Sequence, residues 1–353
     1  MATRRISRTV AGLVVGMLAV TAAAMASAGA ASAPAAPASG SHAATAPVAR
    51  RQACVYTRHQ IDALVAFGKL VGRNFNCAVV YNDAAPTWAG FEKPWFVVHS
   101  DPNLNWAKWA TAVPGRRLIV TQSMIPDEAP ADWRIRVAAG EYDEHARALA
   151  RNLVAAGLGS SVIRLGHEAN GTWYRHSIGS TQADFIAWRT YWARVVTAMR
   201  SVPGAAFQFD LCINAGYRPI AFADYYPGDA YVDIMGIDFY DVLAVPATTP
   251  WFVHWLQQYN QRASMRDLLQ FARQHGKRVS IPEWAVTARG SFPGFGDDDL
   301  YVDALADIVR SNPVEYQSYF LSPTGNVGMM LQDAPKALAA YRRHFGGGGD
   351  AAG

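Results

Sequence analysis

Short apolar runs alternate with amphipathic stretches along most of the chain. Apolar runs bounded by turn residues predict buried strands, and apolar positions that recur every three to four residues predict helices. The predicted strands are residues 54–56, 76–81, 118–122, 162–165, 207–214, 234–240, 279–282 and 316–321. The predicted helices are residues 60–71, 143–156, 181–199, 264–274, 300–310 and 334–344. This alternation is typical of a parallel sheet with helical crossovers.

Eight strand-then-helix units predict an α/β fold of the (β/α)8 (TIM) barrel type, whose active site lies at the C-terminal ends of the strands. Doubly wound sheets alternate in the same way, so periodicity alone leaves them as an alternative. No linker interrupts residues 53–345, which favours one catalytic domain over two.

The N-terminal segment has the layout of a secretory leader. Arg4, Arg5 and Arg8 precede an uncharged run from Thr9 that contains two Ala-Ser-Ala sites before residue 34. We expect residues 1–33 to be a cleaved signal peptide, with a retained anchor as the alternative, and the protein to be secreted. The adjacent arginines also permit a twin-arginine route. Residues 34–52 are predicted to be an Ala/Pro/Ser-rich linker, and residues 346–353 a disordered tail.

Composition excludes several classes of protein. The chain has 353 residues, of which 51% are hydrophobic and 12% aromatic, so it is not a low-complexity disordered chain. Three cysteines are too few for a disulfide framework. The net charge of +4 is small, and loss of the three leader arginines would leave 29 of the 32 basic residues against 28 acidic ones. We therefore expect no nucleic-acid partner.

Two glutamates each end a predicted strand and are followed by aromatic residues. Glu168 ends the fourth predicted strand and precedes Trp173, and Glu283 ends the seventh and precedes Trp284. Glycoside cleavage needs one carboxyl group to protonate the leaving oxygen and a second to attack or to activate water. A barrel can hold two such groups at a fixed distance, whereas a lone glutamate at a strand end would be interpreted as a solvated loop residue. The pair predicts a glycosidase.

Four stretches resemble glycoside hydrolase family 26, which includes β-mannanases. Gly-His-Glu-Ala-Asn-Gly-Thr-Trp-Tyr at 166–174 resembles its acid/base motif, and Pro-Glu-Trp-Ala-Val at 282–286 resembles its nucleophile motif. Residues 231–241 resemble its sixth strand, and residues 138–171 its passage from the third helix to the fourth strand. The resemblance covers most of residues 54–345, and the His-Glu-x-Asn-Gly core is its most specific part.

The resemblance implies a retaining mechanism on a (β/α)8 barrel, with Glu168 as acid/base and Glu283 as nucleophile. It also implies that His167 binds the sugar or orients the acid, that Tyr240 hydrogen-bonds the nucleophile, and that Asn170 supports the site. In retaining enzymes the two carboxyl groups lie about 5–5.5 Å apart.

One departure from the family concerns the residues that follow Tyr174. Arg175 and His176 stand where family members usually carry a second aromatic pair. This leaves the sugar preference of the neighbouring subsite open.

The acid has a requirement that does not depend on the family. Glu168 must stay protonated near neutral pH until it donates, which requires burial or a nearby negative charge, and Glu283 can supply that charge.

Strand alternation predicts a polar layer beneath the two glutamates. Arg164 shares a face with Glu168, and if that face points inward the arginine is buried and needs an anionic partner. Asp238 and Asp210 are the candidates. We hypothesise an arginine-centred layer that holds Glu168 and Tyr240 in position.

Several tryptophans are candidate sugar platforms, because a flat aromatic face matches the C–H face of a pyranose ring. Trp173 and Trp284 are favoured because they flank the glutamates, although core packing is the alternative for each candidate. Trp188 and Trp192, spaced i, i+4 in a predicted helix, are predicted to be core residues. The candidates are Trp88, Trp173, Trp251 and Trp284.

The cysteines and metal-binding residue types give weaker indications. Cys54 and Cys77 fall on the first two predicted strands, which are neighbours in a barrel, and the sequence leaves open whether they are bridged. Cys212 is predicted to be buried. The nine histidines show no metal-ligand spacing, so no metal or other cofactor is expected. Residues 297–299 are three aspartates that either bind calcium or, as we favour, form a charge cluster at a helix N-terminus.

The favoured function is a secreted retaining endo-β-glycanase acting on β-linked plant-type polysaccharide, with β-mannan as the leading substrate. The alternatives are a β-1,3/1,4-glucanase or xylanase on the same scaffold, or a catalytically silent barrel that binds polysaccharide or another protein. The silent barrel is disfavoured because both glutamates and Tyr240 are present. We expect a monomer whose partner is its polysaccharide, with no membrane partner once the leader is removed.

Overall fold

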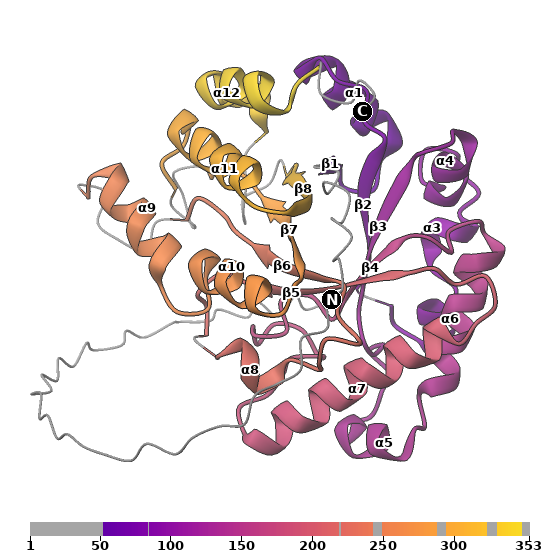
Figure 1. Cartoon of the computed structure of the whole chain (residues 1–353). Coiled ribbons are helices and arrows are strands. Elements are labelled where there is room, and N and C mark those ends of the chain that lie inside the picture. The colour runs from indigo at the N-terminus through magenta and orange to yellow at the C-terminus, as the bar shows by residue number, and fades with distance from the viewer. Residues whose placement is uncertain are drawn as a thin grey trace, which may run out of the picture. The chain divides into compact units, whose positions relative to one another are not determined.

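The computed structural model of the chain describes residues 52–83, 85–218, 220–242, 249–287, 294–322 and 330–347. In this part of the chain, eight parallel strands form a closed barrel in the order β1 to β8, and the helices lie around the strands (Figure 1). The predicted (β/α)8 barrel in a single domain is confirmed. The predicted leader, all of the predicted linker except Gln52, and the tail beyond Gly347 lie outside the described residues.

Each strand is followed along the chain by at least one helix. The strands are β1 (Gln52–Tyr56), β2 (Cys77–Asn82), β3 (Arg117–Gln122), β4 (Val162–Leu165), β5 (Gln208–Asn214), β6 (Ile234–Asp238), β7 (Arg278–Trp284) and β8 (Val314–Phe320). The helices are α1 (Ile61–Val71), α2 (Trp88–Glu92), α3 (Trp95–Val98), α4 (Trp106–Ala112), α5 (Trp133–Ala139), α6 (Asp143–Ala155), α7 (Gln182–Arg200), α8 (Phe222–Tyr225), α9 (Trp251–Asn260), α10 (Met265–Gln274), α11 (Asp299–Ser311) and α12 (Pro335–Phe345), with a short 3-10 turn at Leu331–Asp333.

All eight predicted strands are present, with ends that differ by at most two residues. The six predicted helices are present with ends that differ by at most one residue. Periodicity missed α2, α3, α4, α5 and α8 because helices of four to seven residues are too short to show a repeating apolar stripe. It also missed α9, which begins with the consecutive apolar residues Trp251, Phe252 and Val253 and leaves the last two exposed.

Side chains alternate across each strand between the barrel interior and the layer under the helices. On β1, Cys54 belongs to the interior cluster, while Ala53 and Val55 belong to the large core between strands and helices. The same alternation on β7 decides which residues reach the site. The predicted core residues Trp188 and Trp192 of α7 are buried in the outer layer.

The cysteine question has a clear answer. Cys54 and Cys77 form a disulfide, with Cα atoms 4.6 Å apart, and tie β1 to β2 inside the barrel. Cys212 on β5 is free and buried, as predicted.

The first two residues of the predicted tail, Gly346 and Gly347, lie in the described part of the chain. They lie against the end of α1: a Cβ on Gly346 would lie 2.7 Å from the carbonyl oxygen of Val71. None of the helices in the described ranges is both long enough and apolar enough to cross a membrane.

Candidate active site

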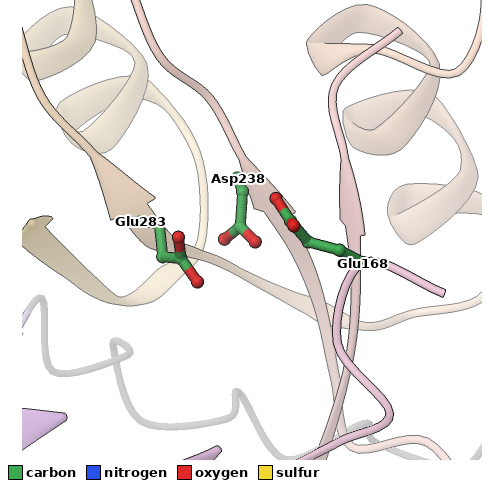
Figure 2. Close-up of side chains that lie close together, drawn as sticks. All are labelled: Glu168, Asp238 and Glu283. Atoms are coloured by element: carbon green, nitrogen blue, oxygen red, sulfur yellow. The ribbon is translucent and has the colours of Figure 1, made fainter. Parts of the chain in front are cut away.

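Three carboxyl groups meet at the C-terminal end of the barrel. Glu168 follows β4, Asp238 ends β6 and Glu283 lies near the end of β7, and Figure 2 shows their carboxyl groups turned toward one another. One oxygen of each lies within 4.8 Å of an oxygen of the others, and all three residues are buried. The structure thus brings the two predicted glutamates together at the end where barrels place their active sites.

Glu168 occupies a turn rather than the strand itself. β4 ends at Leu165, and both Gly166 (φ 60°) and Glu168 (φ 48°) have left-handed backbones. A Cβ on Gly166 would lie 2.6 Å from Sδ of Met124, so glycine is required there. The left-handed conformation at Glu168 costs about 1–2 kcal/mol, and such conformations cluster at active sites. The Glu168 amide holds the turn by donating to the Cys212 carbonyl oxygen at 3.0 Å.

Two donors hold the Glu168 carboxyl group. The Asn214 amide donates to Oε1 at 2.7 Å, and the Trp173 indole donates to Oε2 at 2.9 Å. Burial, followed by the negative charge of Glu283, raises the pKa of Glu168 to about 7, while the two donors and Arg164 act in the opposite direction. Glu168 therefore retains a proton near neutral pH, which is what a general acid requires.

Three donors hold the Glu283 carboxylate. Oε1 accepts from the Tyr81 hydroxyl at 2.6 Å and from Nη1 of Arg164 at 2.6 Å. Oε2 accepts from the Tyr240 hydroxyl at 2.7 Å, so the hydrogen bond expected of Tyr240 is present. Hydrogen bonds of this kind fix the orientation of the carboxylate.

The buried arginine-centred layer exists, with one of its two predicted anionic partners. Arg164 is fully buried and pairs through Nη2 with Asp238 and through Nη1 with Glu283. Its link is thus to the proposed nucleophile, and the expectation that it holds Glu168 through this layer is wrong. The contribution of Asp238 is confirmed.

Asp210, the other predicted partner of Arg164, is engaged elsewhere. It accepts from the Ser280 hydroxyl at 2.6 Å and from the Tyr316 hydroxyl at 2.6 Å. A Cβ on Gly236 would lie 2.6 Å from Oδ1 of Asp210 and 2.7 Å from Oγ of Ser280, so glycine on β6 makes room for this contact. Asp210 therefore belongs to a separate layer that lies deeper in the barrel.

Among the described residues, the three carboxylates of Glu168, Asp238 and Glu283 are the group close enough together to hold a metal ion. The Arg164 guanidinium already donates to two of them and supplies the positive charge that an ion would bring.

Two of the three aspartates at 297–299 cap helices, and the third, Asp299, lies in the first turn of α11. Asp298 accepts from the Tyr301 amide at the start of α11, and Asp297 accepts from the Ala337 amide at the start of α12. The helix N-terminal interpretation is confirmed.

His167 lies behind the carboxylates. Its ring is fully buried against Tyr81, Tyr174 and His176, and neither ring nitrogen has a hydrogen-bond partner among the described residues. Burial and then the charge of Arg164 hold its pKa well below the usual value, so the ring is neutral. Direct sugar binding by His167 is therefore not supported, because the ring offers no accessible polar atom.

Asn170 supports Glu168 indirectly. Its side chain donates to the backbone carbonyl oxygen of Asn214 at 2.8 Å and accepts from the backbone N–H of Asn214 at 2.9 Å. Asn170 thus fixes the end of β5, from which the Asn214 side chain reaches Glu168.

Arg175 and His176 serve the loop that carries the acid. His176 contacts the Ser123 hydroxyl and the His167 carbonyl oxygen, and Arg175 donates to the Ala129 carbonyl oxygen. These two residues, which depart from the family pattern, thus link the loop after β4 to the loop after β3.

Trp173 is the tryptophan whose position fits a sugar platform. It is 46% exposed, packs edge-on against the 51%-exposed Tyr217, and donates to Glu168. The same role for Trp284 is wrong: its ring is 0% exposed and packs against Tyr319 and Tyr341. Because neighbouring residues on a strand point to opposite faces, Glu283 on the inner face places Trp284 on the outer one.

The other two candidate platforms lie away from the carboxylates. Trp88 on α2 stacks on His145 of α6, with ring centroids 3.8 Å apart and planes at 9°. Trp251 stacks on Trp255 within α9 and donates to Asp298. The structure does not bring either ring to the three carboxylates.

Tyr81 is a site residue that the sequence analysis missed. It lies on β2 at the same inward parity as Cys77 and Val79, so alternation could have placed it in the interior near the C-terminal end. Asn214 at the end of β5 is a second missed residue, and its contact with Glu168 depends on a turn that periodicity does not show.

Comparison with known proteins gives a consistent picture. The sequence model described as Glycosyl hydrolase family 26 matches residues 86–274. Endoglucanase H from Acetivibrio thermocellus is 27% identical over 219 residues, which is 59% of this chain; the chain spans only 22% of that relative's length. The family match includes Glu168 and Tyr240 and ends before Glu283.

Solved structures similar to this chain include three mannanases. A GH26 β-mannanase from Bacteroides ovatus has a TM-score of 0.59 and 13% identity, over 84% of this chain and 88% of that one. A mannanase from Bacillus subtilis has a TM-score of 0.57 and 15% identity, over 87% and 91%. An endo-β-1,4-mannanase from Cellulomonas fimi has a TM-score of 0.52 and 18% identity, over 76% and 62%. At identities of 13–18%, the similarity to these structures shows the fold alone.

Proposed function

The chain belongs to glycosyl hydrolase family 26, and from that premise we propose that it is a retaining endo-β-glycanase that cleaves β-mannan, with Glu168 as acid/base and Glu283 as nucleophile. The observation that carries the proposal is the approach of these two carboxyl groups, which have oxygens within 4.8 Å of each other. Inverting enzymes need about 6.5–9.5 Å between the groups to admit a water molecule, whereas retaining enzymes need about 5–5.5 Å.

In the first half of the reaction, Glu283 attacks and Glu168 donates. Oε1 of Glu283 already accepts from Tyr81 and Arg164, while Oε2 accepts from Tyr240 alone. Oε2 is therefore the oxygen that bonds to the anomeric carbon. As that bond forms, the glycosidic bond breaks, and the leaving oxygen takes the proton of Glu168.

In the second half, the ionised Glu168 accepts a proton from water. The water oxygen attacks the anomeric carbon, the bond to Oε2 breaks, and Glu283 returns as a carboxylate. Departure of the leaving group hands the proton to Glu168, and attack by water restores it, so one residue serves as acid and then as base.

The substrate proposal is supported by the solved structures with this fold, which are named as mannanases. A β-glucan substrate is the second candidate, because the curated relative is named as an endoglucanase. Both candidates use the same pair of glutamates and differ in the sugars that the loops accept.

The test compares wild type with Glu168→Ala and Glu283→Ala on mannan, lichenan and xylan. Wild type should release oligosaccharides from mannan fastest, and each variant should lose at least about 1,000-fold in kcat, the scale expected on loss of an essential acid or nucleophile. Proton NMR of fresh products should show the β-anomer first. Glu144→Ala, an exposed carboxylate of α6 that pairs with Arg147, is the matched control and should keep full activity.

Three outcomes would contradict parts of this proposal. Wild-type activity in either active-site variant would exclude the mechanism, and α-anomeric products would exclude retention. Faster cleavage of lichenan or xylan than of mannan would replace the substrate. An absence of cleavage with retained binding would instead indicate a carbohydrate-binding barrel.

We also propose that the protein is secreted after removal of residues 1–33, on the basis of the leader-like sequence. Mass spectrometry of the protein recovered outside the cells should give a mass that lacks the leader. An intact N-terminus in the cytoplasm would contradict this.

A further inference from the structure

We propose that Asp83 binds a hydroxyl group of the glycone, meaning the sugar that becomes attached to the nucleophile and the sugars beyond its nonreducing end. This inference rests on the proposed function and adds a specificity-determining residue to it. Asp83 is not among the residues predicted from the sequence, and its proposed role is to position the sugar rather than to contact the reacting atoms.

Asp83 stands at the correct end of the barrel. It directly follows β2, which ends at Asn82, and C-terminal strand ends surround the catalytic face. Its side chain is 27% exposed, and within the described part of the chain no hydrogen bond joins its carboxyl group to another residue. Its own backbone amide is the one donor that acts on it. A polar group that is largely enclosed yet unpaired is suited to take a ligand as its partner.

The neighbouring cations and imidazole leave Asp83 available. The His167 ring nitrogen Nε2 lies 4.0 Å from Oδ2 of Asp83, and its buried ring is neutral. Arg164 is engaged by Asp238 and Glu283. Neither group forms a close ion pair with Asp83 that a sugar would have to break.

The surroundings of Asp83 favour the glycone side. Asp83 follows Tyr81 by two residues, and Tyr81 donates to Glu283 at 2.6 Å and packs edge-on against Tyr56 of β1 with ring centroids 4.7 Å apart. The charge of Asp83 also acts on Tyr56. The residues that donate to Glu168, on the leaving-group side, come from β5 and from the loop after β4. In the order of the closed barrel, β1 and β2 lie on one side of β4, and β5 lies on the other side of it.

The same region offers an apolar surface beside the carboxylate. Tyr56 stacks on Phe320 at the end of β8, with ring centroids 4.5 Å apart, and both side chains are half-buried. A carboxylate beside aromatic faces suits a pyranose, because the rings pack on C–H groups while the carboxylate accepts from one or two hydroxyls. The ligand chemistry is therefore a neutral hexose with free hydroxyl groups.

The experiment pairs enzyme variants with modified substrates. Wild type, Asp83→Ala and Asp83→Asn are assayed on oligosaccharides of the preferred backbone and on monodeoxy versions that lack single hydroxyls in the glycone. Asp83→Ala should lower kcat/KM about 10- to 150-fold, the loss expected for one charged hydrogen bond, and Asp83→Asn should lose less because its amide oxygen still accepts. Asp127→Asn, an exposed aspartate on the same rim, should match wild type.

The decisive result is the coupling between the two changes. If Asp83 binds a hydroxyl, removal of that hydroxyl slows wild type but has little further effect on Asp83→Ala. A purely structural role would lower the melting temperature and leave the deoxy penalties unchanged, which would overturn the proposal. Unchanged kinetics in both Asp83 variants would overturn it as well.

Calorimetric binding separates this proposal from the proposed function. If wild type binds oligosaccharides but cleaves none, the proposed function fails, and weaker binding by Asp83→Asn would still support Asp83 as a sugar ligand. Equal binding by both proteins, or no binding by wild type, would overturn the assignment of Asp83.

Discussion

The side-chain amide of Asn214 donates to Oε1 of Glu168 at 2.7 Å, so a residue of β5 helps to set the proton affinity of an acid that follows β4. Burial and the charge of Glu283 raise the pKa of Glu168 to about 7, and the Asn214 hydrogen bond limits that rise. The amide favours the ionised form because the carboxylate is the better acceptor.

Asn214→Ala should therefore raise the pKa of Glu168. Activity requires the protonated acid and falls as pH rises through this pKa, so the alkaline limb of kcat/KM should move upward by roughly one pH unit, alongside a lower maximum rate. Trp173→Phe, which keeps the ring and removes its N–H, should move the limb in the same direction. Profiles of kcat/KM against pH provide the measurement, and a limb that stays in place or moves down contradicts the prediction.

Tyr81→Phe and Tyr240→Phe should both lower kcat, and by unequal amounts. Tyr81→Phe leaves Arg164 on Oε1 of Glu283, whereas Tyr240→Phe leaves Oε2 without a donor among the described residues. We expect a loss of about 10-fold for Tyr81→Phe and about 100-fold for Tyr240→Phe, within the range for a hydrogen bond to a charged group. Steady-state kinetics tests this, with Tyr259→Phe on α9 as control. Equal losses would argue against distinct roles for the two oxygens.

Asp238→Asn should cost both stability and activity. It leaves the buried Arg164 with a single ionic partner, and loss of a partner from a buried pair costs about 3–5 kcal/mol. Arg164 would then pair with Glu283 alone, which would displace the Glu283 carboxylate from its position in the wild type. Asp210→Asn makes the same chemical change in the deeper layer and should spare activity. Urea denaturation and mannan hydrolysis measure the two effects, and wild-type behaviour of Asp238→Asn in both would refute the layer.

The barrel was readable from the sequence because strand and helix periods are local properties of short windows. Glu168 and Glu283 were found because each stands beside a strand end with an aromatic neighbour. Trp284 was misassigned because adjacency along the strand was taken for adjacency in space, although the pleat sends Trp284 to the face opposite Glu283.

Contacts between distant segments could not be predicted in the same way. Tyr81 and Glu283 are 202 positions apart, and no local pattern connects them. Arg164 and Asp210 are even cross-strand partners in the sheet register, yet Arg164 reaches Asp238 and Glu283 instead. That choice depends on Ser280 and Tyr316, which lie on other strands and already occupy Asp210.

Asp241 should make the fold less stable at alkaline pH. Burial, and then the charge of Asp298, raises its pKa to about 8, and the His254 imidazole 3.8 Å away has a pKa lowered by burial. The folded state thus favours protonated Asp241. The stability that this protonation contributes is complete at pH values below the ordinary carboxyl pKa, and it is lost as pH rises through about 8. Calorimetry should show a melting temperature that falls from pH 5 to 9, and a smaller fall in Asp241→Asn. Identical slopes would contradict this.

The disulfide between Cys54 and Cys77 has a consequence for the order of assembly. Both cysteines are 0% exposed inside a barrel that β1 closes by pairing with β8. An oxidant that needs contact with the sulfurs must therefore reach them while this seam is still open, and the finished barrel shields the bond from thiols outside. Dithiothreitol given to the native protein should leave activity constant, while the same reagent present during refolding should lower the recovered activity. Whether Cys54 and Cys77 are bridged is therefore decided before β1 pairs with β8, and the closed barrel then preserves that state.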